Sequence, residues 1–481
     1  MRRTLVEPGA PIRPGVLLGL LAFVVGMVVS ARAEAQRAAP QFPDSSAAKQ
    51  IERPDEGYVA VKRPWLAASE VVGVNALVWS YDRYIRENGT NPGFRIGFNS
   101  FQENIQNGFE FDDNNFSTNM YAHPYHGDLY FNAARSNGMS YWGSVPYTWG
   151  GSFMWEYFGE VHHPAINDWI LTSMGGMALG EVFFRLSQMV TDNTATGSRR
   201  SWGEVGGLII SPVRGFTRLV TGEFNRVGPN PPDRFPRSSR VSYRVGLRTS
   251  GQDQLWDADT TRPFIEVAAY VGDPFLGDNK KPYDSFDFNF QININDAQTI
   301  GRVQTIGLLA SSPVMGTDHS KHLIGFTQHF DYFNNSDIEL GGQSLAASLY
   351  SQFRAGEHFA VRTQLHMNAL IMGATKDNYQ TFTGRSYDFG PGLAFKFGST
   401  FYYHGHPYLM LTHSRFWIHS INGSVSDHLI STSRVRFDVP LTRGFSIGAD
   451  YWLYTADRLY RDLPDVYERV PVLRTGISFN L

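Results

Sequence analysis

The sequence contains no cysteine, so disulfide bonds, thiol catalysis and cysteine-ligated zinc are excluded from its chemistry. Charge is also scarce, because charged residues make up 18% of the 481 residues and the net charge is −3. A nucleic-acid surface needs a concentrated basic footprint, so nucleic acid is not expected as a partner. Phosphate-binding loops, dinucleotide fingerprints and nucleophile elbows do not occur in the sequence, which therefore predicts no cofactor.

The mean hydropathy of −0.27 is lower than a helical membrane protein would show. Aromatic residues nevertheless reach 14% of the chain, with 35 Phe and 23 Tyr. These two properties are compatible in a membrane β-barrel, because only every second residue of each strand faces lipid.

The N-terminus has the pattern of a secretory signal peptide. Basic residues precede an apolar run over 16–29, and Ala31, Ala33 and Ala35 provide the small residues of a cleavage site. The run is shorter than the roughly 20 residues that a membrane-spanning helix requires. We therefore predict a signal peptide over 1–35, followed by a polar leader over 36–63 that is expected to be disordered.

Apolar and polar residues alternate repeatedly in the C-terminal half of the chain. Alternation with a period of two places one set on each face of a strand, and segments of about ten residues can cross a bilayer at a tilt. At roughly 20 residues per strand and turn, residues 240–481 predict an antiparallel outer-membrane β-barrel of about 12 strands. The clearest alternating segments are 243–248, 285–295, 361–371, 389–397, 445–453 and 473–481.

The last segment favours this barrel over the alternative, a large soluble β-sandwich with shorter strands. Alternation continues to the final residue, Leu481, as in the C-terminal signal of outer-membrane barrels, although these prefer Phe at that position. The protein is therefore expected in the cell outer membrane. Its expected partners are outer-membrane lipid and the barrel assembly machinery, and its oligomeric state stays open.

The two faces of the predicted strands should contact different surroundings. We expect the apolar rows, which include Phe288 and Leu393, to face lipid. Pairs such as Asp278-Asn279 and Gly341-Gly342 are expected at turns. The polar rows should line the lumen and determine any selectivity, and they include Arg244, Arg248, Arg362, His366 and Asp450.

Residues 64–224 predict a small helical module. Helices are expected from Pro64, over 144–160 and over 164–189, with an amphipathic segment at 206–220. Carboxylates interrupt each apolar stretch, and a charge at the bilayer centre costs at least about 2.5 kcal/mol. The helices are therefore expected in the periplasm or inside the barrel mouth. A proline-rich connector over 225–239 should separate the module from the barrel.

Six motifs follow one another within this module. They are FDDNNFSTN at 111–119, HPYHG at 123–127, YFNAARSNG at 130–138, WEY at 155–157, PAIND at 164–168, and the glycine pair and single glycine that precede Glu181. Together they resemble the bacterial family DUF3943, over about residues 75–190. The resemblance implies a Gram-negative envelope protein and no assigned activity.

The polar side chains of the module are the candidates for a functional site. His123 and His126 could bind a divalent metal ion, although their spacing matches no standard metal motif. Acid–base catalysis could use five residues, and these are His123, His126, Glu156, Asp168 and Glu181.

The alternative for these residues is a buried structural network of Arg135, Glu156 and Asn167, in which Arg135 neutralises a carboxylate. A buried carboxylate is costly unless it is paired, so Glu156 should lie near His123, His126 or Arg135 in either case.

Two functions from different classes remain open. The first is an outer-membrane barrel without assigned activity, either a narrow or plugged channel or an envelope scaffold. The second is an envelope lipid-modifying hydrolase with its site in the helical module. Whether the protein is an enzyme stays open with them.

Overall fold

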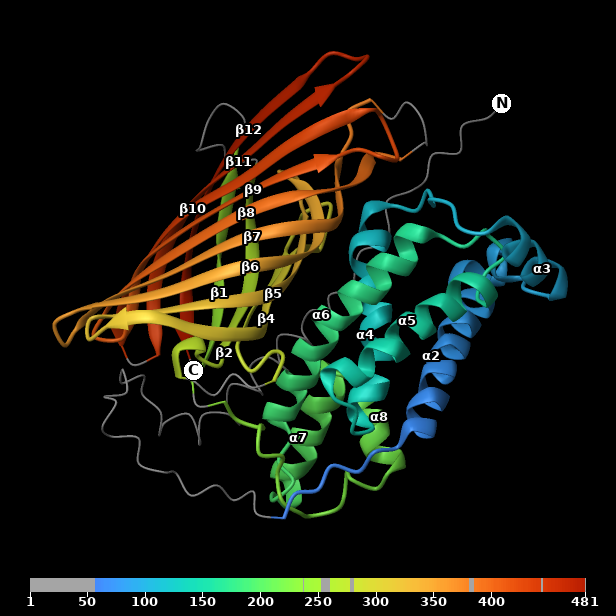
Figure 1. Cartoon of the computed structure of the whole chain (residues 1–481), viewed down its shortest axis with the longest axis horizontal. Helices are drawn as coiled ribbons and strands as arrows, with labels where there is room; N and C mark the ends of the chain where they lie inside the picture. The colour runs from blue at the N-terminus through green and yellow to red at the C-terminus, as the bar shows by residue number, and fades with distance from the viewer. Residues whose placement is uncertain are drawn as a thin grey trace.

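The computed structural model describes residues 57–236, 238–251, 260–276, 281–379, 385–442 and 444–480. The predicted signal peptide, most of the predicted leader, the Asp278-Asn279 pair and Leu481 lie outside the described residues. The described chain forms a helical module and a β-barrel that stand side by side (Figure 1).

The helical module has helices in each region where the sequence predicts one. Pro64 occupies the first turn of α2, where its missing N–H needs no partner. The prediction of a single segment at 206–220 is wrong, because Ser211 is extended before Pro212 and separates two helices. Of the helices in the described residues, none combines the length and the apolarity that a membrane crossing needs. The helices are α2 (Pro64–Tyr84), α3 (Phe98–Asn107), α4 (His123–Ser136), α5 (Tyr141–Phe158), α6 (Ile166–Val190), α7 (Gly197–Ile210) and α8 (Pro212–Val220).

Helices α4 and α6 approach each other closely at two glycines. A Cβ atom built on Gly127 would lie 1.8 Å from the main-chain oxygen of Thr172, and one on Gly176 would lie 2.4 Å from the main-chain carbon of Gly127. A Cβ atom on Gly180 would lie 2.7 Å from the ring of Phe131. The small residues of α6 therefore form the surface that receives α4.

The C-terminal part is a closed antiparallel barrel of twelve strands, the number that the sequence predicts. Each strand pairs with its neighbours in sequence, and the barrel closes where β1 pairs with β12, with Tyr243 opposite Phe479. Closure leaves no free edge and excludes the soluble sandwich. The strands are β1 (Ser239–Ser250), β2 (Thr261–Val271), β3 (Phe286–Asn293), β4 (Ile300–Thr317), β5 (Ser320–Asn334), β6 (Glu339–Ala355), β7 (Phe359–Lys376), β8 (Tyr387–Tyr403), β9 (His406–His419), β10 (Ser426–Thr442), β11 (Phe445–Tyr460) and β12 (Val466–Asn480).

The strand faces follow the predicted alternation over most of the barrel. On β11, Phe445 and Ile447 are exposed on the outside, whereas Ser446 and Asp450 are buried towards the lumen. On β8, Leu393 is 58% exposed on the outer wall. An apolar outer wall on a closed barrel is the arrangement that lets strands contact lipid.

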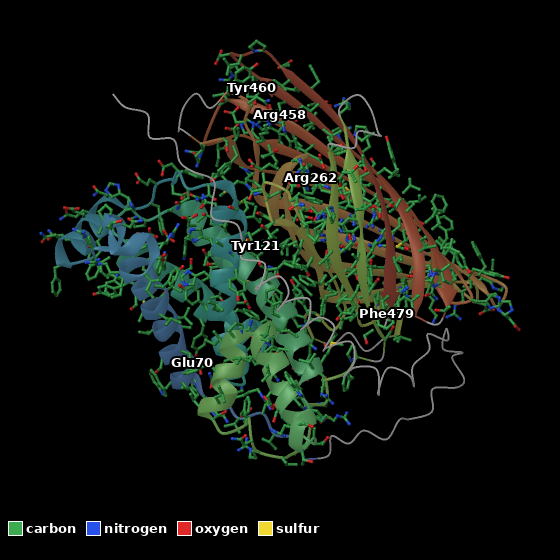
Figure 2. All side chains as sticks on the ribbon, turned by 180° about the vertical axis from the view of Figure 1, so that it is seen from behind. Glu70, Tyr121, Arg262, Arg458, Tyr460 and Phe479 are labelled. Carbon is green, nitrogen blue, oxygen red and sulfur yellow. The ribbon has the colours of Figure 1, made fainter. Side chains whose placement is uncertain are left out.

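The helical module packs against the outside of the barrel over strands β2 to β8 (Figure 1). The ring of Phe183 on α6 meets that of Phe288 on β3 edge to face, with centroids 5.8 Å apart. Gln328 Nε2 on β5 donates a hydrogen bond of 3.0 Å to the main-chain oxygen of Met174. Figure 2 shows Tyr121 at this junction, and its ring lies 5.4 Å from that of Tyr332.

This packing overturns three predictions. The helices do not lie inside the barrel mouth, because an apolar surface of α6 is buried on the outer wall. Phe288 does not face lipid, since the module covers it and leaves it 7% exposed. Gly341-Gly342 is not a turn but part of β6, where a Cβ atom on Gly341 would lie 2.3 Å from the Cε atom of Met120.

Gly127→Ala should destabilise the helical module. The new Cβ atom would overlap the Thr172 oxygen, so α4 and α6 would have to separate, at a cost of roughly 3 kcal/mol, the upper end for overpacked cores. Unfolding by urea in detergent, followed by helical circular dichroism, measures this cost. Gly150→Ala is the matched control, because nothing lies within 4 Å of its Cβ position and alanine favours a helix by about 1 kcal/mol. Equal stabilities for the two variants would contradict the packing.

Leu393→Arg should destabilise the barrel by roughly 2–4 kcal/mol, because it places a charge on the lipid-facing wall. Gln364→Arg on β7 is the control, since its side chain lies on the lumen row. Equilibrium unfolding in lipid vesicles, read by heat-modifiable gel mobility, compares the two. Equal sensitivity of both rows would argue that the outer wall does not meet lipid.

Candidate functional site

Three helix ends bring a histidine and two carboxylates together at one end of the module. His123 begins α4, Glu156 lies near the end of α5, and Asp168 lies in the first turn of α6. Their candidate ligand atoms all lie within 4.8 Å of one another. Glu156 and Asp168 are each 2% exposed and His123 is 9% exposed, so this triad is almost entirely shielded from solvent.

Amide side chains hold the triad in place. Asn167 Nδ2 donates to Asp168 Oδ1 at 2.7 Å and to Asp112 Oδ1 at 2.6 Å, and Asn119 Nδ2 donates to the same Asp112 oxygen at 2.7 Å. The second oxygen of Asp168, Oδ2, lies 3.3 Å from His123 Nε2. Asn167 and Asp112 therefore fix which Asp168 oxygen faces the histidine.

Glu156 is held by only one of its two oxygens. Its Oε2 accepts a hydrogen bond of 2.8 Å from the Ala165 N–H. Its Oε1 is buried and has no hydrogen-bond partner within the part of the chain that the structure describes. A buried acceptor without a partner is costly, so this oxygen marks the point where the site is chemically unsatisfied.

Burial sets the protonation of the triad. It raises the pKa of Glu156 and that of Asp168 well above their usual range, and the neighbouring carboxylates Glu160 and Asp112 raise both further. Burial also raises the pKa of Glu160 to about 7 and lowers the pKa of His123. Four carboxyl groups converging on one imidazole will attract either protons or a cation.

Glu181 belongs to a separate cluster, as does Arg135. Arg135 donates to both Glu181 oxygens, at 2.6 and 2.9 Å, and Arg185 Nε adds a third contact of 2.8 Å. Arg185 also reaches Asp284 beside the barrel, at 3.2 Å. The predicted network is therefore corrected in one respect: Arg135 neutralises Glu181, and Glu156 has His123 as its neighbour instead. Two guanidinium partners make Glu181 a structural anchor rather than a proton donor.

His126 does not join the triad. Its Nε2 lies 2.8 Å from the Tyr130 hydroxyl, and its ring packs edge to face on Trp155 with centroids 5.0 Å apart. Burial, and then the nearby His123, lower the pKa of His126 to about 3. The two histidines that the spacing treats alike therefore differ, because only His123 faces carboxylates. Sequence reasoning missed Asp112, Asn119 and Glu160, although the run at 111–119 was among the family motifs.

A second polar cluster fills the barrel lumen and includes two of the predicted lumen residues. Glu266 Oε2 accepts from Arg302 at 2.7 Å and from Arg474 at 2.6 Å. Asp450 pairs with Arg244, and it also lies 3.5 Å from Arg474 Nε. Glu266 was missed because Phe264 and Tyr270 share its face of β2, so polarity does not alternate along that strand.

The remaining predicted lumen residues are engaged as well. Arg248 pairs with Asp296 at 2.5 Å and with Asp337 at 2.8 Å. Arg362 reaches Asp273 at 2.7 Å, and His366 Nδ1 lies 2.8 Å from the Ser348 hydroxyl.

Cavities lie on either side of the charge cluster. One of about 240 Å³ is lined by Tyr454, Arg458 and the connection between β5 and β6. The other, of about 50 Å³, is lined by Arg240, Tyr402 and Ser446. Figure 2 shows Arg458 and Tyr460 at one end of the barrel and Phe479 at the other.

Solved structures to which the chain is similar are outer-membrane barrels. It resembles the NanC porin at 12% identity with a TM-score of 0.28, covering 50% of this chain and 100% of that one. It resembles the KdgM porin at 6% identity with a TM-score of 0.23, covering 50% and 98%. It also resembles the channel DcaP of Acinetobacter baumannii at 9% identity with a TM-score of 0.21, covering 50% and 96%. No curated protein matches.

The closed barrel and its exposed apolar wall place the protein in the outer membrane, as predicted. A family comparison matches residues 108–213 to DUF3943, a domain of unknown function. The match confirms the resemblance and contains all six motifs, although it begins after α2 and α3 rather than near residue 75. The chain thus carries a DUF3943 domain, packed on the outer wall of an outer-membrane β-barrel.

Proposed function

We propose that this protein is an outer-membrane scaffold, in which a barrel filled by its own side chains holds the DUF3943 domain against its outer wall. The observation that carries this proposal is the ion-pair network across the lumen. It joins strands from both sides of the β1–β12 closure, and its members are Arg244, Glu266, Arg302, Arg434, Arg436, Asp438, Asp450 and Arg474.

The network obstructs the path that an ion would take. Glu266 and Asp450 are each 1% exposed, and Arg474, which contacts both, is 2% exposed. Along β11, Asp450 lies between Ser446 and Tyr454, which line the cavities at the two ends. An ion would have to separate buried charges whose loss of a partner costs about 3–5 kcal/mol. A closed lumen supports the scaffold over the channel.

The domain on the wall lies at the level of the lipid-facing residues. On β5, Phe326 is 45% exposed, whereas Phe330, on the same face, is covered by the module. The outward side of the bundle carries large apolar residues, including Leu77, which is 72% exposed on α2, and Phe153, which is 40% exposed on α5. The polar residues of these helices, such as Ser152, point inward. This distribution suits a bundle whose outer side meets hydrocarbon, with the barrel shielding one flank.

The hydrolase alternative gains no support from the comparisons with known proteins. One of its five candidate residues, Glu181, is occupied by two arginines. Another, His126, is engaged by Tyr130.

Wild-type protein in planar bilayers should show no steady conductance, whereas Glu266→Gln should leak. The lumen network contains five arginines and three carboxylates, so the leak should favour anions. Asp427→Asn is the control, because that carboxylate lies outside the lumen and its side chain is 45% exposed. Asp450→Asn serves as a second test variant if the first fails to assemble. A steady open pore in the wild type would overturn the scaffold proposal.

The lack of cysteine allows a direct test of the module's surroundings. In vesicles, Leu77→Cys on α2 should react with a water-soluble maleimide at least tenfold more slowly than Ser198→Cys on α7, an exposed residue beside the charged Arg199. Detergent should remove most of the difference, because it replaces the lipid with an exchanging micelle. Equal rates in vesicles would show that the outer side of the bundle meets water.

A further inference from the structure

We propose that His123, Glu156 and Asp168 bind a divalent transition-metal ion where α4, α5 and α6 meet. This site is independent of the scaffold role, since its residues lie in the DUF3943 domain and not in the lumen. The sequence alone pairs His123 with His126 as ligands, whereas the structure replaces His126 by two carboxylates.

The distances fit one shared ion. The three candidate ligand atoms lie within 4.8 Å of one another. Ligands about 2.0–2.2 Å from a common ion are themselves about 3–3.5 Å apart, so small side-chain rotations would complete the coordination. The His123 Nε2 to Asp168 Oδ2 distance of 3.3 Å already has this value.

One ligand oxygen lacks a partner. Glu156 is 2% exposed, and its Oε1 has no hydrogen-bond partner in the described residues, while the Ala165 N–H fixes its Oε2. A purely structural network would be expected to satisfy such an oxygen, because every buried acceptor left open costs stability. A cation bound between Glu156, Asp168 and His123 would satisfy it.

The surrounding groups are those of an outer coordination shell. Asn167 donates to Asp168 Oδ1 at 2.7 Å, which leaves Oδ2 directed at His123. Asp112 accepts from both Asn167 and Asn119, so the amide that orients Asp168 is itself held in place. Hydrogen bonds of this kind orient metal ligands and tune their basicity.

The donor set indicates the class of metal. One imidazole nitrogen and two carboxylate oxygens suit Zn²⁺, Mn²⁺ or Fe²⁺. Ca²⁺ prefers six to eight oxygen ligands and Mg²⁺ retains much of its water, so neither favours a histidine ligand. Three protein ligands would leave one position open to water or to an outside ligand.

The test uses the full-length protein in detergent, stripped of metal with a chelator and then equilibrated with Zn²⁺ or Mn²⁺. We expect about one ion per chain by elemental analysis, and an X-ray absorption spectrum with a single imidazole among nitrogen and oxygen ligands. Added metal should also raise the unfolding midpoint of the helices, because it binds only the folded site.

Glu156→Gln and His123→Asn should each weaken the affinity at least tenfold, while heat-modifiable mobility and circular dichroism remain unchanged. The matched controls are Glu110→Gln and His163→Asn, an exposed carboxylate–histidine pair in the same module, and these should bind as the wild type does. If the variants of the triad fail to fold, the metal-dependent shift of the wild-type midpoint still decides. Binding no stronger than in Glu156→Gln, or no shift, would overturn the site and leave the scaffold proposal untouched.

Discussion

The contact between α6 and the outer wall of the barrel is the interaction on which the arrangement of this molecule depends. Its apolar part joins Phe183 to Phe288, and its polar part joins Gln328 and Gln343 to main-chain oxygens of α6. Because α4 lies against the glycines of α6, the position of α6 also fixes α4. The end of α6 that bears Asp168 is thereby set, together with the triad that forms around it.

The molecule treats its two buried polar clusters in opposite ways. In the lumen, each carboxylate has several arginine partners, so the charges are compensated where they stand. At the ends of α4, α5 and α6, carboxylates gather around His123 and one Glu156 oxygen has no partner among the described residues. A compensated cluster serves rigidity, whereas an uncompensated one invites a proton or a cation.

Much of the fold could be predicted from the sequence because alternation reports directly on the two environments of a barrel wall. Phe445 and Asp450 point where the pattern places them. The pattern fails at Phe288 and Gly341, since a helix covering the wall turns a lipid-facing position into an interior one, and alternation carries no information about which helix arrives. The triad was predicted only in part, because helical spacing cannot reveal that Tyr130 engages His126.

The position of the DUF3943 domain on the wall bears on how the barrel is assembled. Its contacts run over β2 to β8, while Val245, Leu247 and Ile477 on the two strands that close the barrel remain exposed. The last pairing of barrel biogenesis, β1 with β12, can therefore form or open without displacing the domain. Insertion machinery that grips a nascent barrel at its closing strands would meet a wall clear of the domain, so the domain can dock before the barrel is sealed.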